Sequence, residues 1–531
     1  MNGLSGISTL RRLWLGAALA GSATALAGAA TADISPLLYG PEPDAVRSGG
    51  SLTYGSLVEP PALDPFHQGA DARIRVTTLI YQGLFYEGED GPIPLLARDF
   101  EVSDDGLVYT FHLRDGVRFH TGGEMTAADV KYSYDYIRDP DNGSPGAGDF
   151  NMIDEIRVID DLTVEFVLTS PNASLPMALG NKYGAVVPAG TFDADGSRAA
   201  MNDRSVGTGP FMIREYQPNS FLELERFADY WQPGLPYLDE ITYLYLPNNA
   251  ALLVALQNNR VDVARLGRPQ DAEQIEGMPN ITVQRWPALE QKALDLDSNY
   301  GALSDERVRQ AISLAVDKEE ILQAAIGGYG TVIHTIVAGM QESWGVPRDE
   351  LDFQGPDRER ARALLEEAGH GSGVDLTLTT IIGYDWMDPA AVTLREQLAE
   401  IGVNLEIRRV DLGVWIDNFR SRNMGFTFND WATQPDPNLL FFRHFHQQPQ
   451  GADFRNWNND VASELLRQGQ QESDPEARRA IYRDFQKELA RSVPTIMLFS
   501  ADHVTVTSNR VHNFWQHPTG WHFGLVKTQV E

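Results

Sequence analysis

Side chains that could act in catalysis are plentiful in the 531-residue chain, but none stands in a spacing that defines a reaction. No Gly is followed by Lys, so the phosphate loop of nucleotide hydrolases is absent. Neither His-Glu-x-x-His nor Gly-x-Ser-x-Gly occurs, which removes the usual signatures of zinc proteases and serine hydrolases. The 74 Asp and Glu residues form carboxylate pairs throughout the chain, so spacing alone nominates no glycosidase pair. These absences favour a protein that is not an enzyme.

Patterns that bind metals or cofactors are equally sparse. The chain contains no Cys, which excludes disulfides, Cys-type zinc sites and iron–sulfur clusters. His444 and His446 could place two imidazoles on one face of a strand, but an isolated pair of this kind is more often solvated. We therefore expect no metal and no cofactor.

The charge balance narrows the class of partner. The 43 Lys and Arg residues against 74 Asp and Glu give a formal net charge of −31. Nucleic acids and anionic membranes require clustered basic residues, so neither is expected as a main partner. The 42% hydrophobic content is ordinary for a globular protein, and the length suggests roughly three compact units or one large multi-lobed body.

The N-terminus has the features of an export signal. Arg11 and Arg12 are the only charges in the first 32 residues, and an apolar run rich in Ala, Gly and Leu follows them. Ala30 and Ala32 supply the small residues that a signal peptidase needs, so we expect cleavage after Ala32 and a signal peptide at residues 1–32. A membrane anchor is the alternative, but the small residues of the run make it a poor spanning helix. The paired arginines resemble a twin-arginine signal, and the general secretory route stays open.

Strands and amphipathic helices alternate through the rest of the chain. Period-two patterns with turn residues ahead of them predict strands that form antiparallel hairpins, and Asp residues before helical patterns predict capped helices. We expect strands at residues 51–55, 107–113, 162–168, 374–381 and 403–410. We expect helices within residues 305–316, 317–326, 357–369 and 390–401, and from 474 onward. The predicted fold class is α/β with antiparallel excursions.

Four groups of short motifs follow one another between residues 50 and 510. They are residues 113–120 with 122–130 (LRDGVRFH and GGEMTAADV), residues 206–211 (VGTGPF), residues 229–231 with 236–241 (DYW and PYLDEI), and residues 307–318 (RVRQAISLAVDK). In this order they resemble the family 5 extracellular solute-binding proteins, the peptide- and nickel-type receptors of bacterial ABC importers. His120, Gly207 and Gly209 also have a structural reading as turn residues, so the motifs identify the fold and not the ligand site.

The resemblance implies a bilobal periplasmic-binding-protein clam-shell with an extra N-lobe subdomain and discontinuous lobes joined by two hinge strands. The N-lobe would hold residues 33–296 in two subdomains, with residues 498–531 returning to it, and residues 297–497 would form the inserted C-lobe. Residues 286–296 and 495–506 read as extended segments, which suits hinge strands because two crossings let the lobes rotate without unfolding either core.

The resemblance also implies a function. The protein would be a periplasmic, monomeric receptor that captures a small peptide or peptide-sized solute and delivers it to an inner-membrane ABC permease. A sugar-, opine- or metal-complex-type solute in the same fold is an alternative, and an exported hydrolase on the same scaffold is a second one.

Three loops combine the aromatic walls and few polar anchors that a closing cleft requires: residues 59–67, 383–388 and 428–437. The second leaves a predicted strand and enters a helix, where ligands of α/β domains commonly bind. The candidate ligand-binding residues in these loops are Phe66, His67, Tyr384, Trp386, Asp430, Trp431, Thr433 and Asp436. Core packing is the alternative for the aromatic residues, and Arg268 and Arg443 are further candidates to meet a ligand carboxylate.

In peptide receptors of this family, an Asp shortly before an Asp-Pro-Asp-like segment receives the α-ammonium of the peptide. Aligning that segment on residues 435–437 places Thr433 at the anchor position. A hydroxyl cannot neutralise a cation held away from water, and an unpaired buried charge costs several kcal/mol. Either Asp430 or Asp436 substitutes as the anchor, or the natural ligand lacks a free α-ammonium. We favour the second interpretation.

Overall fold

The computed structural model describes residues 35–67, 71–88, 91–193, 197–335, 340–432, 436–447 and 454–531. The expected signal peptide and Thr433 lie outside these ranges. None of the helices in the described part of the chain combines the length and the apolar character that crossing a bilayer requires.

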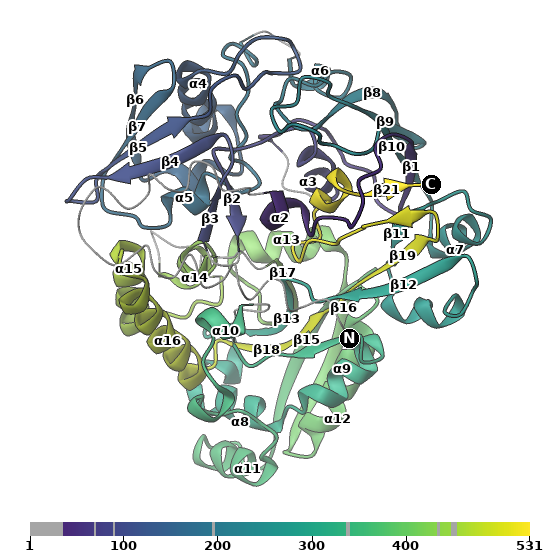
Figure 1. The fold of residues 1–531 in the computed structure, drawn as a ribbon. Helices are drawn as coiled ribbons and strands as arrows, with labels where there is room; N and C mark the ends of the chain where they lie inside the picture. Colours follow the sequence, from purple (N-terminus) through teal and green to yellow (C-terminus); the bar gives the residue numbers. More distant parts are fainter. Residues whose placement is uncertain are drawn as a thin grey trace.

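Two large mixed sheets form the centres of two lobes (Figure 1). In spatial order, the N-lobe sheet contains β12 (Ile281–Trp286), β19 (His503–Ser508), β11 (Val263–Arg265), β1 (Ser51–Ser56), β10 (Glu240–Tyr245), β9 (Phe221–Arg226) and β8 (Phe211–Gln217). The C-lobe sheet contains β14 (Gly330–Val332), β18 (Thr495–Ala501), β13 (Glu290–Leu296), β17 (Phe426–Ala432), β15 (Val374–Ile381) and β16 (Val403–Val410).

A smaller antiparallel sheet forms the extra subdomain of the N-lobe. Its strands are β4 (Ala97–Val102), β5 (Val108–Leu113), β7 (Thr163–Leu168) and β6 (Ile153–Asp160), and the hairpin β2 (Phe85–Gly88) and β3 (Gly91–Pro94) lies beside it. A short pair, β20 (Val511–His512) and β21 (Gln529–Val530), ends the chain. The antiparallel pairing of β5 and β7 with their neighbours confirms the predicted hairpins.

The helices divide between the lobes. The N-lobe carries α2 (Ser35–Tyr39), α3 (Asp71–Thr77), α4 (Ala127–Arg138), α5 (Leu175–Ala178), α6 (Ser197–Ala200) and α7 (Asn249–Gln257). The C-lobe carries α8 (Glu306–Ala315), α9 (Lys318–Ile326), α10 (Gln341–Trp344), α11 (Arg358–Glu367), α12 (Met387–Ala399), α13 (Leu412–Ser421), α14 (Pro437–Phe445), α15 (Asp460–Gln471) and α16 (Pro475–Ser492).

Local signals in the sequence account for most of these boundaries. Asp305, Asp317, Asp357 and Asp474 each accept a hydrogen bond from a backbone N–H in the first turn of the helix that follows, so these four helices begin within a residue of the predicted starts. The predicted strands at residues 374–381 and 403–410 form β15 and β16, which pair in parallel on either side of α12 in the chain.

Two details of the sequence-based expectations change. The expected strand around His444 and His446 is wrong, because α14 runs to Phe445 and residues two apart on a helix point to different sides. Gly207 and Gly209 have a structural role, as expected, but the need for glycine comes from close backbone packing and not from a turn. A Cβ at these positions would lie 2.1 Å from the carbonyl oxygen of Ile80 and 2.4 Å from that of Leu79, so the backbones approach too closely for a side chain.

The chain passes between the two sheets twice. Strand β12 leaves the N-lobe sheet at Trp286, and β13 enters the C-lobe sheet at Glu290; β18 leaves that sheet at Ala501, and β19 enters the N-lobe sheet at His503. In Figure 1 the last strands, in yellow, run from β18 in the C-lobe back into the N-lobe. These paired crossovers confirm the bilobal clam-shell with two hinge strands.

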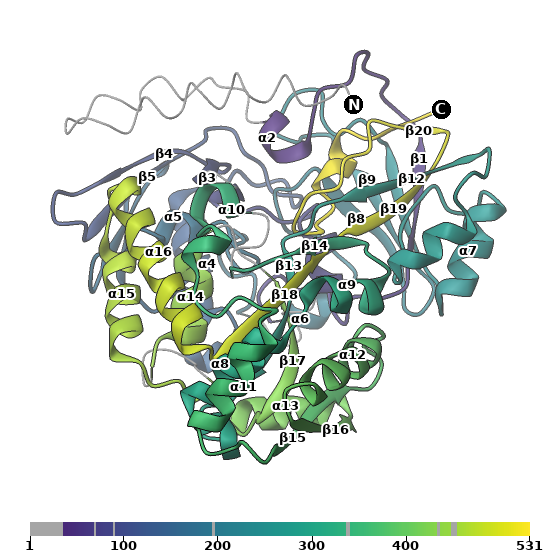
Figure 2. The ribbon, with the colours of Figure 1, turned by 90° about the horizontal axis from the view of Figure 1, so that it is seen from below.

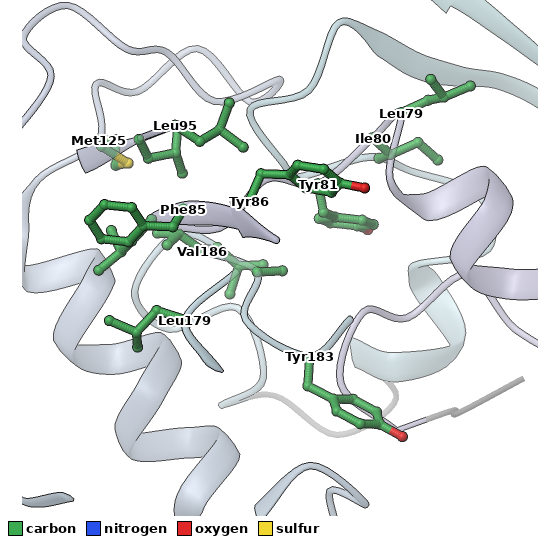
Figure 3. Close-up of a cluster of buried hydrophobic side chains, with 14 of the residues drawn as sticks. Leu79, Ile80, Tyr81, Phe85, Tyr86, Leu95, Met125, Leu179, Tyr183 and Val186 are labelled. Carbon is green, nitrogen blue, oxygen red and sulfur yellow. The ribbon is translucent and has the colours of Figure 1, made fainter. Parts of the chain in front are cut away.

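Separate hydrophobic cores stabilise the lobes. One core joins the N-lobe sheet to the extra subdomain, and Figure 3 shows the part of it around Phe85, Tyr86 and Leu95. The C-lobe has a core on each face of its sheet, one under α8, α9 and α12 and the other under α14, α15 and α16. Helices α14 to α16 lie beside the extra subdomain in both ribbon views (Figures 1 and 2).

Candidate functional site

The two sheets present matching edges to each other. Strands β15 and β17 run parallel, so their carboxyl ends share one edge of the C-lobe sheet, and β13 starts at that edge. In the N-lobe sheet β1, β10 and β11 run parallel, and β19 starts beside their carboxyl ends. Both crossovers join these two edges. Ligands of open α/β sheets bind beyond the carboxyl ends of the strands, so the space between the edges is the candidate site.

A row of alternating charges links the two edges. Arg265 at the end of β11 donates to Glu290 at the start of β13 over 2.9 Å. Lys292 lies 3.5 Å from Glu290 and 2.6 Å from Asp430 on β17. Burial acts to raise the pKa of Glu290, but Arg265 and Lys292 hold that pKa well below its usual value. Burial acts to lower the pKa of Lys292, but Asp430 and Glu290 raise it, so Lys292 and Glu290 are both charged at neutral pH.

Trp386 lies next to this row. Its ring packs against Phe428 and Phe499, with centroids 5.2 and 5.8 Å apart, and the Lys292 ammonium lies 5.8 Å from the ring centroid. The indole Nε1 is buried and has no hydrogen-bond partner in the part of the chain that the structure describes. An unpaired buried donor is costly, which marks Trp386 as a group able to donate to a bound solute. Tyr384, two residues earlier, packs half-buried against the same core.

Both candidate carboxylates already have cationic partners. Asp430 accepts a hydrogen bond from Lys292. Asp436 caps α14 and accepts two hydrogen bonds from Arg478, one of 2.7 Å from Nη1 and one of 3.0 Å from Nη2. The Trp431 backbone pairs with that of Gln291 in the C-lobe sheet. The structure therefore brings Trp386, Asp430 and the Trp431 backbone to one edge, and places Asp436 in a separate ion pair.

Phe66 and His67 make their contacts inside the N-lobe. Phe66 is fully buried, and both rings pack against those of Tyr136 and Phe192. His67 also pairs through Nδ1 with Asp64. These contacts place both residues within the packing of the N-lobe.

The lobes touch at a second place, away from the crossovers. Ser174 precedes α5 in the N-lobe, and its Oγ accepts a hydrogen bond of 2.8 Å from Arg478 and donates one of 3.2 Å to Asp436. The backbone N–H of Ala173 donates to the carbonyl of Gln470 over 3.0 Å. Sequence reasoning missed Ser174 and Arg478, because nothing local marks two residues that meet across 304 positions.

In the described ranges, no group of three or more His, Asp or Glu side chains is arranged to hold a metal ion. Arg268, a candidate to meet a ligand carboxylate, lies 3.6 Å from Asp271 and is half-exposed.

The two-lobed α/β architecture with a double crossover is that of the periplasmic binding proteins. Residues 91–452 match the family described as bacterial extracellular solute-binding proteins, family 5 middle, and the chain belongs to this family. This confirms the resemblance found in the sequence motifs.

Relatives cover almost the whole chain. The glutathione-binding protein GsiB of Pectobacterium atrosepticum is 25% identical over 533 residues, covering 96% of this chain and 97% of that protein. The periplasmic binding protein DppA from Helicobacter pylori, solved in complex with the peptide STSA, is 25% identical with a TM-score of 0.78, covering 91% of this chain and 99% of that one. The binding protein AgaA from A. tumefaciens R10, in complex with agropinic acid, is 26% identical with the same TM-score and the same coverage.

Proposed function

We propose that this protein captures a peptide-sized solute between its two lobes and delivers it to the inner-membrane permease of an ABC importer. The observation that carries the proposal is the pair of facing carboxyl edges joined by two crossovers, in a chain of a solute-binding family. Closure of such lobes excludes water from a bound solute and buries it on both sides. The protein releases its solute chemically unchanged.

The similar proteins differ in what they bind, which leaves two solute classes. Their printed names and titles give glutathione, the peptide STSA and agropinic acid. A small peptide or peptide-sized solute is the first candidate. An opine-like acid without a free α-ammonium is the second, and the pairing of Asp430 with Lys292 and of Asp436 with Arg478 supports it. A ligand ammonium would have to compete with a cation of the chain at either carboxylate.

We propose Tyr384, Trp386, Asp430, Trp431 and Thr433 as the C-lobe wall of the site. Phe66 and His67 support the opposing wall from behind through their packing on Tyr136. Asp436 acts in lobe closure through Arg478 and Ser174.

We propose further that the lobes divide at the crossovers, residues 287–289 and 502, and not at the boundaries after residues 296 and 497 that were expected from the sequence. The mature protein is a periplasmic monomer that begins at Asp33 after export, by the twin-arginine or the general secretory route. Intact-mass measurement of protein from its native host tests the cleavage site, and a retained Met1 would contradict it.

The solute is tested with the mature protein and a thermal-shift screen. Glutathione, the peptide STSA, its N-acetylated form and agropinic acid are compared at equal concentration. Binding shifts the melting temperature upward by linkage, and micromolar affinity corresponds to about −8 kcal/mol. Stabilisation by the free peptide that is lost on N-acetylation would show that the ammonium is recognised. Recovery of a chemically altered solute, at a rate that a point mutation abolishes, would overturn the receptor function.

A further inference from the structure

A cavity of about 40 Å³ lies in the N-lobe, between α3, β2 and the turn that follows α5. Tyr81 and Tyr86, which line it, are labelled in Figure 3. One water needs about 10–15 Å³ of such space, so the cavity has room for about three water-sized groups. That is the size of a carboxylate.

The wall of this cavity carries positive charge. Arg73 and Lys182 line it, and no Asp or Glu is among the described residues that do. Aromatic rings of Tyr86, Trp521 and Phe523 complete the wall.

Arg73 is a buried cation without a bound carboxylate. It is 1% exposed, and its guanidinium donates only to backbone carbonyls, including those of Pro65 at 2.6 Å and Lys182 at 3.1 Å. Its Nε is buried and has no hydrogen-bond partner among the described residues. Burial lowers the pKa of Arg73 to about 10, so the group stays charged at neutral pH. The nearby Asp64 carboxylate already accepts hydrogen bonds from the Phe66 backbone and pairs with His67.

Lys182 is the second cation, and its ammonium lies 5.3 Å from the centroid of the Tyr183 ring. It donates no hydrogen bond from Nζ to any described residue. Glu87 lies close enough for Lys182 to act on it, but burial raises the pKa of Glu87 to about 8, so this carboxyl is largely protonated at neutral pH. Asp149 in turn accepts a hydrogen bond of 3.1 Å from Asn181.

The cavity adjoins the face where the lobes meet. Lys182 and Trp521 are half-buried, so they mark its solvent side. The turn that contains Lys182 follows α5, and Ser174 just before α5 contacts Arg478 and Asp436 of the C-lobe. A solute held between the lobes can therefore extend one end into the cavity.

We propose that this cavity is the subsite for a carboxylate of the solute, with Arg73 and Lys182 as its cationic partners and the aromatic rings as its walls. The inference rests on the proposed function and narrows it to solutes that carry a compact acidic end. It complements the C-lobe, where Asp430 at the sheet edge and Asp436 at the start of α14 are each paired with a cation of the chain. The N-lobe side of the site therefore has cations available to a solute, whereas the carboxylates on the C-lobe side are already paired.

The primary test is the Lys182→Gln variant, because the Lys182 ammonium holds no part of the backbone. Isothermal titration compares wild type and variant with glutathione, the peptide STSA and agropinic acid. A hydrogen bond to a charged group contributes about 1.5–3 kcal/mol, so we expect the variant to bind the acid at least about tenfold more weakly. An ester that masks the carboxylates of the same solute should bind wild type and variant alike. Lys131→Gln removes a charge from α4, where Lys131 pairs with Asp135, and should leave affinity unchanged.

A second arm needs no identified solute. Acetate replaces chloride at constant ionic strength, and the subsite predicts that it raises the melting temperature of wild type but not of Lys182→Gln. If a solute binds wild type and Lys182→Gln equally and acetate has no effect, the subsite proposal is wrong. The receptor function would still hold. Stabilisation by acetate in wild type alone, with no solute of the panel binding, would support the subsite and contradict the proposed solute classes.

Discussion

Arg478 in the C-lobe donates a hydrogen bond of 2.8 Å from Nη2 to the Oγ of Ser174 in the N-lobe. The same guanidinium pairs with Asp436, which also accepts from the Ser174 hydroxyl, so one hydroxyl joins both members of a buried ion pair. The contact lies on the far side of the lobes from the α7 and β12 region, beside helices α14 to α16 (Figure 2). It therefore closes the lobes at a point that the hinge strands do not control.

Ser174→Ala should loosen the closed form without unfolding either lobe. A hydrogen bond to a charged group contributes about 1.5 kcal/mol or more, so we expect solute dissociation to become roughly tenfold faster. The Asp436–Arg478 pair remains, and the urea midpoint should change little. Stopped-flow dissociation measures the effect. Ser421→Ala, whose hydroxyl bonds to the Asp417 carbonyl within α13, is the matched control. Equal dissociation rates in wild type, Ser174→Ala and Ser421→Ala would show that Ser174 has no part in lobe closure.

Asp436→Asn should destabilise the C-lobe strongly. The side chains of Asp436 and Arg478 are 5% and 9% exposed, and removing one partner of a buried pair costs about 3–5 kcal/mol because the other charge is left uncompensated. The substitution also weakens the cap of α14. Urea unfolding followed by tryptophan fluorescence checks the expectation. Asp135→Asn breaks a more exposed pair with Lys131 and should cost less than about 1 kcal/mol. A similar cost at both positions would show that the Asp436 pair is not buried in solution.

Local signals carried most of the fold prediction. Asp317 and Asp474 identify their helices because capping depends on neighbours within three residues, and β15 and β16 have the predicted bounds because their patterns are strictly local. The short motifs then identified the family and with it the two lobes.

The candidate site was less predictable, because its contacts join distant parts of the chain. Lys292 reaches Asp430 across 138 positions, and Arg73 reaches the Lys182 carbonyl across 109. The sequence offered Asp436 as a substitute anchor for a ligand ammonium, and only the fold places Arg478 against it. Pairing of this kind depends on tertiary packing, which no local spacing encodes.

Lys318 predicts a pH dependence of stability. Its ammonium is buried and bonds to the Ile333 carbonyl and Gln354, and burial, with a smaller effect of Arg348, lowers its pKa to about 7. The unfolded chain holds this proton up to a pKa of about 10.4. Between these values the unfolded state binds more protons, so stability from this group rises with pH.

We therefore compare wild type with Lys318→Met in urea at pH 7 and pH 9. Relative to the variant, the unfolding free energy of wild type should increase by about 2 kcal/mol between pH 7 and pH 9. Lys487→Met is the control, since the half-exposed ammonium of Lys487 pairs with Glu350 and this hydrogen bond raises its pKa. A pH-independent difference for Lys318→Met would contradict the buried, easily deprotonated amine.

Trp386→Phe separates solute recognition from core packing. The indole Nε1 has no partner among the described residues, so the substitution removes no hydrogen bond from the protein and keeps an aromatic ring against Phe428 and Phe499. We expect unfolding free energy to fall by only about 1 kcal/mol, and solute affinity to fall about tenfold if the indole donates to the solute. Trp415→Phe is the matched control, because its Nε1 donates to Thr427 over 3.1 Å and its loss should lower stability without changing affinity. Isothermal titration and urea unfolding of both variants give the two quantities. Unchanged affinity in Trp386→Phe would assign this residue to the core, and the C-lobe wall would then begin at Asp430 and Trp431.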